Sequence, residues 1–392
     1  MIPNFKTIVC SESRSGREFH RAGWIIVDLF TIIENGYIEV DKGFITGVHK
    51  GRPEEKCIDH GPGVLMPPLV NTHLHLELSA LKGCLPFDKG FKIWVKTLLE
   101  KRETLGQEKL IKAAQNSVQD LVKSGNLYIG DISTLGIIKS IIEDSALNGV
   151  CFHEFLGSDI PPFFVQKNDS VSFSVSGHAP HTSSPQLLKA LKQCSKSNGL
   201  PFSIHVAESD DESEFIHDKK GPWADFLTLR GIDWSSWEIG SKSPIAYIND
   251  MGLLDPLTIA VHVLNASDMD LEILSQSKTK VCVCPRSNQN LHGKLPDIEK
   301  MIIAGIQPAI GTDSLASCDS LNIFDEMAFV QTHYPMLDPA IIFSMGTING
   351  ARALGIDHLT GTLAKGKRAQ FLYRPLKAKN KKELFQRTLS NE

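Results

Sequence analysis

The sequence has no long apolar run, no paired-cysteine motif and no excess of charge of one sign. Its longest apolar runs, such as residues 24–27, are strand-sized and far short of the roughly 20 residues that a membrane helix needs. This excludes a membrane-spanning protein. The formal net charge is -4 over 392 residues, which gives no reason to expect a nucleic acid or another polyanionic partner.

The cysteines and the first residues both favour a cytoplasmic protein. Eight cysteines are scattered without a Cys-x-x-Cys pair, and a chain of this length does not need disulfides to fold. The start, Met1-Ile-Pro-Asn-Phe-Lys, lacks the apolar segment of a secretory signal. Cys282 and Cys284 share one face of a predicted strand, and we expect them to be plain core residues.

The middle of the chain alternates short apolar strands with amphipathic helical stretches. Hydrophobic residues make up 42% of the sequence and charged residues 22%, as in a globular protein with a large core. Eight strands followed by helices predict an α/β fold, a closed (β/α)8 TIM barrel over residues 63–356. The predicted strands are Leu65–His73, Asn126–Asp131, Gly149–Phe155, Ser170–Gly177, Phe202–Val206, Thr258–His262, Thr279–Cys284 and Gln307–Gly311.

Both ends of the chain favour short strands. We expect residues 1–62 and 357–392 to form one small β-sandwich domain. The tripeptide Glu34-Asn35-Gly36 between two strand-like runs is a hairpin signal, so we predict a turn there. Ser183 and Ser184 before Pro185 predict the start of a helix. Segments 159–170 and 230–250 are expected to be loops over one end of the barrel.

His73 and His75 are the strongest chemical signal. Alternate residues of a strand share a face, so both imidazoles can reach one metal ion. Active sites of such barrels lie at the carboxyl ends of the strands. Each of these side chains alone is more often a core or surface residue, but together they favour a metal site. The polar residues at the ends of the other predicted strands are His178, His181, His205, Glu208, His262 and Asp313.

This layout resembles the amidohydrolase superfamily, in particular its deaminase and chlorohydrolase branch. The resemblance covers residues 60–355. It implies one metal ion per chain, Zn²⁺ with Fe²⁺ or Mn²⁺ as alternatives, because no lysine follows the fourth strand to bridge two ions. The matching stretches are Pro68-Leu-Val-Asn-Thr-His-Leu-His-Leu-Glu77, His178-Ala-Pro-His181, His205-Val-Ala-Glu208, Pro285-Arg-Ser-Asn288 and Gly311-Thr-Asp-Ser-Leu-Ala-Ser317.

The resemblance also implies roles for individual residues. His73, His75, His205 and Asp313 are the implied metal ligands, Glu208 the proton shuttle and His262 the group that orients water. Asp313 can in addition accept a proton from water, and zinc lowers the pKa of bound water to about 7. This chemistry suits the hydrolysis of an amino group on an electron-poor ring.

Five residues are expected to bind substrate, each with a structural alternative. His178 matches a histidine that touches substrate in similar nucleoside deaminases, but a structural hydrogen bond is the alternative. Glu77 shares the parity of the His73 pair, so it either lines the pocket or supports it. Arg286 and Asn288 could bind a carboxylate or a base edge, or Arg286 could pair with an acidic residue inside the barrel mouth. Glu100 is a candidate for ribose binding or a solvated position on a helix face.

The sequence therefore predicts a metal-dependent aminohydrolase of an adenine-type nucleoside. Its length and the Glu77-Leu-Ser run most resemble the aminodeoxyfutalosine deaminases of menaquinone biosynthesis. Alternatives are thiomethyladenosine or S-adenosylhomocysteine deaminase, guanine deaminase and chlorotriazine hydrolase. A noncatalytic barrel scaffold is a remote alternative, because it predicts damage to a catalytic set that is intact here. The expected partner is a small molecule, and we expect a homodimer or higher homo-oligomer.

Overall fold

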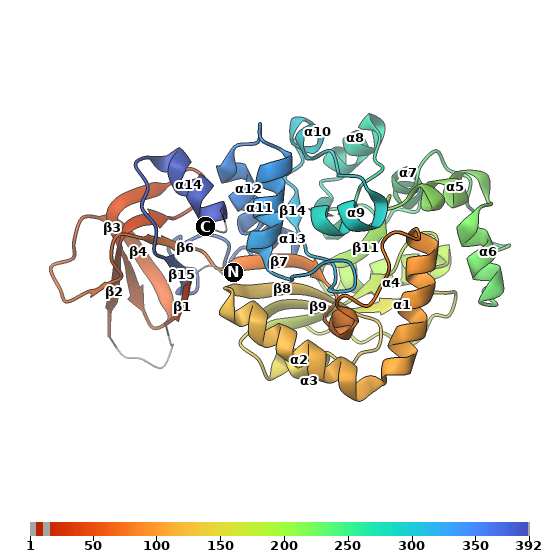
Figure 1. Cartoon of the computed structure of the whole chain (residues 1–392), viewed down its shortest axis with the longest axis horizontal. Helices are drawn as coiled ribbons and strands as arrows, with labels where there is room; N and C mark the ends of the chain where they lie inside the picture. Colours follow the sequence, from red (N-terminus) through yellow and green to blue (C-terminus); the bar gives the residue numbers. More distant parts are fainter. Residues whose placement is uncertain (1–4, 11–15, 391–392) are drawn as a thin grey trace.

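The computed structural model describes residues 5–10 and 16–390, and its centre is an eight-stranded parallel barrel (Figure 1). The strands hydrogen-bond in chain order from β7 to β14, which confirms the predicted (β/α)8 fold. The barrel strands are β7 Leu69–Leu74, β8 Asn126–Ser133, β9 Asn148–Phe155, β10 Val171–Gly177, β11 Phe202–Val206, β12 Thr258–His262, β13 Lys280–Val283 and β14 Ala309–Ile310.

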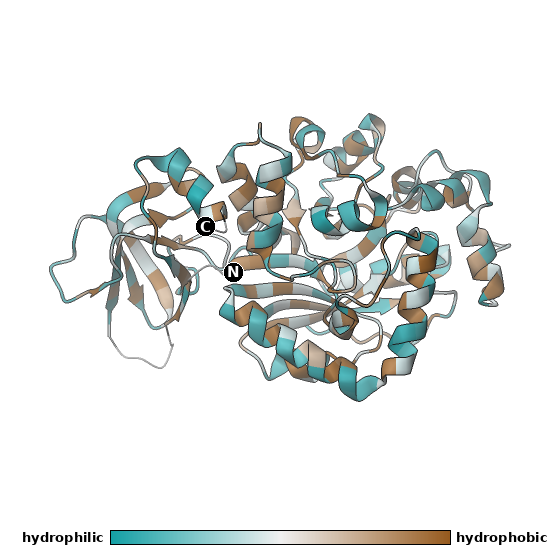
Figure 2. Ribbon diagram, in the orientation of Figure 1, coloured by the Kyte–Doolittle hydropathy of each residue, from teal (hydrophilic) through white to brown (hydrophobic). Residues whose placement is uncertain are grey.

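Helices surround the barrel with apolar faces inward and polar faces outward (Figure 2). Helix α4 shows the pattern: Leu187, Leu188 and Leu191 are fully buried, and the hydroxyl of Ser184 accepts the amide proton of Leu187 as the predicted cap. The helices are η1 Leu76–Leu81, α1 Phe91–Leu105, α2 Gln107–Lys123, α3 Lys139–Glu143, α4 Pro185–Ser197, α5 Asp210–Asp218, α6 Pro222–Leu229, α7 Pro244–Asp250, α8 Asp268–Gln276, α9 Pro285–His292, α10 Ile298–Ile303, α11 Ile323–His333, α12 Pro339–Met345, α13 Ile348–Ala353 and α14 Lys381–Leu389.

Helix α7 occupies the end of segment 230–250, which was expected to be a loop throughout; Ser243 caps it and Pro244 occupies its first turn. Within the described residues, no helix has the length and apolar character that crossing a bilayer requires.

The barrel closes between its first and last strands at the histidine pair. The carbonyl of His73 accepts the amides of Thr312 and Asp313 at 3.0 and 3.1 Å, and the amide of His75 donates to the carbonyl of Asp313 at 2.9 Å. A side chain at Gly311 would lie 2.7 Å from the oxygen of His73, so only glycine permits this approach. The closure therefore brings Asp313 next to His73 and His75.

The small domain is formed from both ends of the chain, as expected, and lies beside the barrel (Figure 1). Its strands form one mixed seven-stranded sheet in the order β1-β15-β6-β2-β3-β4, with β5 paired to β2. Ile25, Ile38, Leu65 and Phe371 are fully buried in its core. The strands are β1 Lys6–Val9, β2 Glu18–Ile26, β3 Ile32–Asp41, β4 Phe44–Lys50, β5 Ile58–Asp59, β6 Val64–Met66 and β15 Gln370–Arg374.

The small sheet and the barrel meet near Pro67 and again at α14. Strand β6 pairs with β15 and β2 of the small sheet, so the first barrel strand begins only after Pro67-Pro68, where the missing amide protons interrupt the strand. Helix α14 contacts both parts of the protein: Phe385 lies against Phe343 of α12 with ring centroids 5.5 Å apart, and Arg374 of β15 donates to the carbonyls of Thr388 and Ser390. The chain therefore leaves the small sheet near Pro67, and its last helix contacts both that sheet and the barrel.

The predicted hairpin turn was wrong in position. The turn lies at Asp28–Thr31, where the carboxylate of Asp28 accepts the amides of Phe30 and Thr31 at 2.8 and 2.7 Å. Glu34-Asn35-Gly36 lies inside β3. Asn35 there has φ 52°, a left-handed conformation that asparagine tolerates, so the signal marked an irregularity in a strand.

A buried carboxyl beside the histidine pair predicts a pH-dependent stability. Asp131 of β8 is fully buried, accepts the amide of Leu76 at 2.9 Å, and burial raises its pKa to about 8. The folded protein keeps this proton between the unfolded pKa near 4 and the folded value, so this contribution to stability falls as pH rises through that window. Asp131→Asn should therefore gain stability relative to wild type as pH rises, by at most about 1.4 kcal/mol per pH unit. Urea unfolding at pH 5, 6.5 and 8 measures this.

The matched control is Asp120→Asn on the exposed face of α2. Its difference from wild type should not change with pH. A difference for Asp131→Asn that is constant from pH 5 to 8 would contradict the assigned titration.

Candidate metal centre and active site

A cavity of about 310 Å³ opens at the carboxyl ends of the barrel strands. That volume is at the lower end of small-molecule sites. Strand ends supply its polar side, and α1 and α6 supply an apolar wall. The polar lining contains His75, Glu77, Glu154, His178, His181, His205, Glu208, His262 and Asp313, and the wall contains Leu78, Phe91, Trp94, Val95, Leu98, Leu99, Trp223 and Phe226.

Three strand ends bring the four predicted metal ligands together. Nε2 of His73 and of His75 lie 3.9 and 3.6 Å from Oδ1 of Asp313. The rings of His73 and His205 have centroids 4.8 Å apart. One ligand atom from each of His73, His75 and Asp313 lies within 4.8 Å of the others, and so does one from each of His73, His205 and His262.

The donor set fits a divalent metal ion. Both ring nitrogens of His73 are buried without a hydrogen-bond partner among the described residues, which is costly unless something binds them. Nδ1 of His205 donates to the carbonyl of His178 at 2.8 Å, leaving Nε2 for the ion. Burial, and then the neighbouring imidazoles, hold the pKa of His73 and His75 well below the ordinary value, so both rings are neutral. Neutral imidazoles with one carboxylate are the ligands that zinc prefers.

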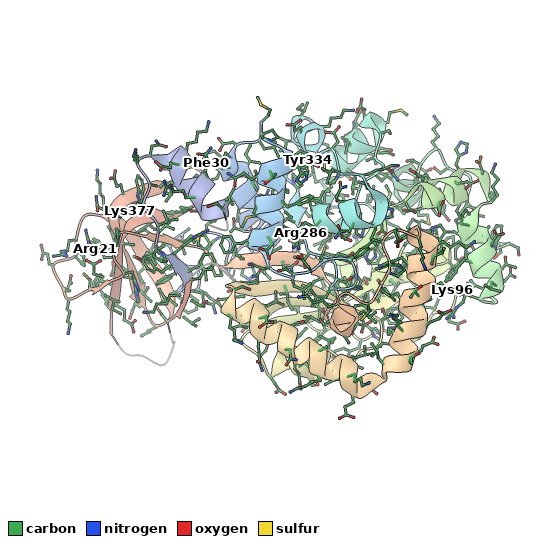
Figure 3. All side chains as sticks on the ribbon, in the orientation of Figure 1. Arg21, Phe30, Lys96, Arg286, Tyr334 and Lys377 are labelled. Atoms are coloured by element: carbon green, nitrogen blue, oxygen red, sulfur yellow. The ribbon has the colours of Figure 1, made fainter. Side chains whose placement is uncertain are left out.

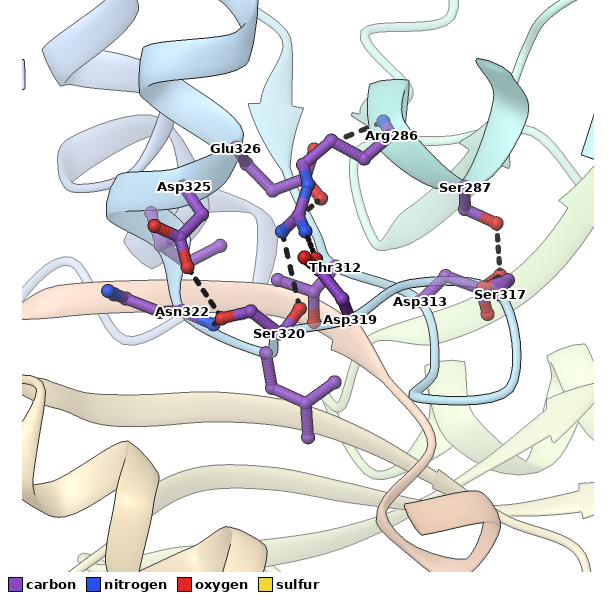
Figure 4. A network of polar contacts seen from close by, with 12 residues as sticks. Arg286, Ser287, Thr312, Asp313, Ser317, Asp319, Ser320, Asn322, Asp325 and Glu326 are labelled. Carbon is purple, nitrogen blue, oxygen red and sulfur yellow. Dashed lines mark hydrogen bonds and ion pairs between the residues drawn. The ribbon is translucent and has the colours of Figure 1, made fainter. Parts of the chain in front are cut away.

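Asp313 is held with one oxygen toward the histidines. Its Oδ2 accepts hydroxyl protons from Ser287 at 2.5 Å and Ser317 at 2.8 Å, and its Oδ1 faces His75 (Figure 4). Its backbone has φ 60°, a strained conformation for a residue with a side chain, and such strain is concentrated at functional sites.

Glu208 follows β11 in a turn held by a second, fully buried carboxylate. Glu212 accepts the amides of Ala207 at 3.1 Å and of Glu208 at 2.8 Å, and Ala207 has φ 53°. Oε1 of Glu208 lies 3.6 Å from Nε2 of His262 and 3.5 Å from Nε2 of His292. Burial acts to raise the pKa of Glu208, but these two imidazoles outweigh it and hold the pKa below its usual range. Glu208 is therefore an ionised carboxylate that can accept a proton.

His262 is fixed by Asn288, one of the predicted substrate residues. Nδ2 of Asn288 donates to Nδ1 of His262 at 3.1 Å, so the ring proton lies on Nε2, the atom nearest Glu208. Both His262 and the next residue have positive φ, 73° and 48°. Asn288 is fully buried and does not line the cavity, so its predicted substrate contact is replaced by a contact to His262.

Helix α9 supports three of these groups at once. Ser287 contacts Asp313, Asn288 contacts His262, and His292 contacts Glu208. The stretch Pro285-Arg-Ser-Asn288 was expected as a motif at the end of the seventh strand and not as a helix, and nothing in the sequence singled out His292. Its ring packs on Phe91 of α1 with centroids 4.7 Å apart.

Two of the other predicted substrate residues line the cavity. Nδ1 of His178 lies 2.7 Å from the hydroxyl of Thr182. Glu77 accepts three hydrogen bonds, from the hydroxyl of Ser133 and the amides of Thr134 and Leu135, at 2.9–3.0 Å. The carboxylate of Glu77 therefore already holds the loop after β8. This agrees with the alternative in which Glu77 supports the pocket instead of binding substrate.

The remaining two predicted substrate residues, Arg286 and Glu100, do not line the cavity. The guanidinium of Arg286 contacts Asp319, the carbonyl of Ser320 and the buried carboxylate of Glu326 (Figure 4). It therefore pairs with acidic residues, the alternative weighed above. Glu100 is on the exposed face of α1, 3.9 Å from Lys96, which Figure 3 labels. The side chains of α1 that reach the cavity are others, among them Leu98, Leu99 and Arg102.

Three lining residues, Glu154, Arg102 and Arg230, have no counterpart in the sequence-based prediction, and a fourth, His181, was named there as a strand-end residue without a role. Oε1 of Glu154, at the end of β9, lies 3.7 Å from Nδ1 of His205. His181 is buried with neither ring nitrogen hydrogen-bonded to a described residue, and its ring lies 4.3 Å from that of Trp223. Arg102 and Arg230 are the only arginines or lysines among the described lining residues, and no described residue forms an ion pair with either.

Comparisons with known proteins find relatives over most of the chain. The family model described as "Amidohydrolase family" matches residues 64–382. Aminodeoxyfutalosine deaminase of Deinococcus radiodurans is 28% identical over 320 residues, 74% of this chain and 73% of that protein. Adenosine deaminase of Helicobacter pylori is 32% identical over 327 residues, 78% of this chain and 77% of that protein.

One solved structure has the same fold along nearly the whole chain. It is Helicobacter pylori aminofutalosine deaminase in complex with methylthio-coformycin, with a TM-score of 0.84 and 24% identity. The match covers 95% of this chain and 96% of that one. At this identity the likeness is evidence of fold alone.

Proposed function

Because the chain belongs to the amidohydrolase family and is a hydrolytic enzyme that acts on carbon–nitrogen bonds, we propose a substrate for it. The substrate is an adenine nucleoside with an anionic 5′ substituent, which the enzyme deaminates. Aminodeoxyfutalosine, an intermediate of menaquinone biosynthesis, is the substrate that fits best. The observation that supports this proposal is the lining of the cavity, which combines a histidine-rich end, an apolar wall and two arginines.

The histidine-rich end supplies the reacting groups. A divalent ion held by His73, His75, His205 and Asp313, zinc by its donor set, would lower the pKa of coordinated water to about 7. Asp313 and His262 orient the attacking oxygen. Glu208, ionised at rest, accepts a proton and delivers it to the ring nitrogen and then to the leaving ammonia.

The apolar wall and the arginines select the rest of the substrate. Trp94, Leu98 and Phe226 offer a surface for an aromatic group, and Arg102 and Arg230 offer charged donors to a carboxylate. Aminodeoxyfutalosine carries both an adenine and an aromatic carboxylate. 5′-Methylthioadenosine and S-adenosylhomocysteine would use the adenine end equally well, and they are the second candidates because a curated relative, 26% identical over 348 residues, is named as a deaminase of these two compounds.

A panel of nucleosides tests this proposal. The zinc-loaded protein is assayed by the ultraviolet change from adenine to hypoxanthine with aminodeoxyfutalosine, methylthioadenosine, S-adenosylhomocysteine and adenosine, and with guanine as a control. The highest kcat/KM is expected for aminodeoxyfutalosine. Ammonia release from none of these compounds would refute the deaminase, and a preference for methylthioadenosine would refute the substrate.

The arginines give a sharper prediction. Arg102→Met should raise KM for aminodeoxyfutalosine about 10- to 100-fold, because a hydrogen bond between charged groups contributes about 1.5–3 kcal/mol. The KM for methylthioadenosine, which has no carboxylate, should change little. Lys96→Met on the exposed side of the same helix is the matched control and should behave as wild type. Equal increases in KM for both nucleosides would remove this role from Arg102.

A further inference from the structure

The small β domain contains a second cluster of metal-ligand side chains, far in sequence from the catalytic residues. Cys10 follows β1, whereas Glu18 and His20 are alternate residues of β2 and so share one face of that strand. Their sulfur, carboxylate and imidazole atoms all lie within 4.8 Å of one another. None of the three lines the catalytic cavity.

The separations in this cluster match those around one tetrahedral ion. Nε2 of His20 lies 3.5 Å from Sγ of Cys10 and 3.4 Å from Oε2 of Glu18. Zinc binds sulfur at about 2.3 Å, nitrogen at about 2.05 Å and oxygen at about 2.1 Å, which at a tetrahedral angle separates sulfur from nitrogen by about 3.5 Å and nitrogen from oxygen by about 3.4 Å. In the catalytic cluster the two nitrogen–oxygen distances to Asp313 are 3.9 and 3.6 Å, which lie no closer to the tetrahedral value.

His20 is also oriented as a ligand. Its ring is 2% exposed, and Phe371 packs edge-on against it with centroids 4.9 Å apart. Nδ1 of His20 lies 3.1 Å from Nε2 of His60, and the two rings stack at 8°. Metal-bound histidines almost always use their second nitrogen in such a hydrogen bond, which fixes the tautomer and leaves the first nitrogen for the ion. The first nitrogen here faces Cys10 and Glu18.

We propose that Cys10, Glu18 and His20 bind a second transition-metal ion, zinc by their chemistry, with His60 orienting His20. Thiolate, imidazole and carboxylate together suit zinc and exclude magnesium and calcium, which prefer oxygen alone. Three protein ligands leave one position for water. Strands β15 and β6 separate β1 from β2 in the sheet, so the ion links two strands that are not neighbours. Its role is to stabilise the small domain, independently of the deamination.

Cobalt substitution of the full-length protein tests this proposal, because the proposed catalytic ligands include no cysteine. Metal-free protein is titrated with Co²⁺, and bound metal and the thiolate-to-cobalt absorption in the near ultraviolet are measured. Wild type should bind two equivalents and show the thiolate band. Cys10→Ser should lose the band and one equivalent while keeping wild-type kcat. His73→Ala should lose the other equivalent and the activity but keep the band.

Controls separate this site from other thiols and from misfolding. Cys84, an exposed residue, gives the matched variant Cys84→Ser, which should keep the band. Glu18→Gln retains the thiol and should weaken cobalt binding at least tenfold at this site, so it tests the cluster if Cys10→Ser does not fold. One equivalent without a thiolate band in wild type, or a band that survives Cys10→Ser, would overturn the proposal: the cluster would then be a hydrogen-bonded group only.

Discussion

Asp313→Asn is expected to lower kcat about 10⁴-fold, the upper end of what general acid–base catalysis contributes. Asp313 has two functions in the proposed mechanism, as an anionic ligand beside His73 and His75 and as a base. An amide can fill the same space and keep the contacts with Ser287 and Ser317, since both hydroxyls can also accept a hydrogen bond. It cannot accept a proton from water. The fold should therefore survive while turnover is lost.

The measurement is kcat with a saturating adenine nucleoside, together with bound metal and the circular dichroism of the variant. Asp268→Asn, an exposed residue of α8, is the matched control and should keep wild-type kcat. Wild-type turnover in Asp313→Asn would refute its role as ligand and base.

Glu208→Gln is expected to keep a full equivalent of metal at the catalytic site but to lower kcat about 10²- to 10⁴-fold. The carboxylate lies against His262 and His292 and is not among the proposed ligands. Glutamine retains the size of the side chain and can still hydrogen-bond both imidazoles. What it loses is the capacity to carry a proton from water to the ring nitrogen and then to ammonia.

Metal analysis distinguishes this outcome from a structural one. Loss of metal together with activity would show that Glu208 holds the ion or the fold, and wild-type kcat would show that another group carries the proton. Glu272→Gln on the exposed side of α8 is the control, since it removes a carboxylate of the same length away from the cavity.

The barrel could be predicted from sequence because each strand is a short apolar run and each helix has an apolar face. These are local properties, and the eight predicted strands all overlap observed ones. The clustering of His73, His205 and Asp313 could also be predicted, because parallel strands of a closed barrel end on one rim. The spacing of residues within one strand, as for His73 and His75, fixes the shared face.

The errors concern contacts that local patterns do not encode. Nothing near Arg286 in sequence indicates that it pairs with Glu326, which arrives from α11, a helix that follows the last barrel strand. The face of α1 that meets the cavity depends on where α6 packs, so Arg102 was missed and Glu100 was chosen. His292 was missed for the same reason, since its partner Glu208 belongs to a different strand end.

The turn at Asp28–Thr31 was missed because the nearby Asn35-Gly36 pair is a stronger sequence signal for a hairpin turn. The register of β2 and β3 across their full length overrides that signal and absorbs Asn35 as a local distortion. The turn propensity of the sequence thus identified Asn35 as a residue with positive φ, but it did not show that Asn35 lies within a strand.

The closure of the barrel at His73 and Asp313 has a consequence for the order of events during synthesis. The ribosome releases the histidine pair long before Asp313, which follows it by more than 200 residues. Until β14 docks beside β7, Asp313 does not stand opposite the two imidazoles, and with the proposed ligand set a nascent chain would hold the ion weakly. Tight metal uptake therefore reports that the last barrel strand has docked, and a truncation before residue 313 should yield a product that a chelator strips easily.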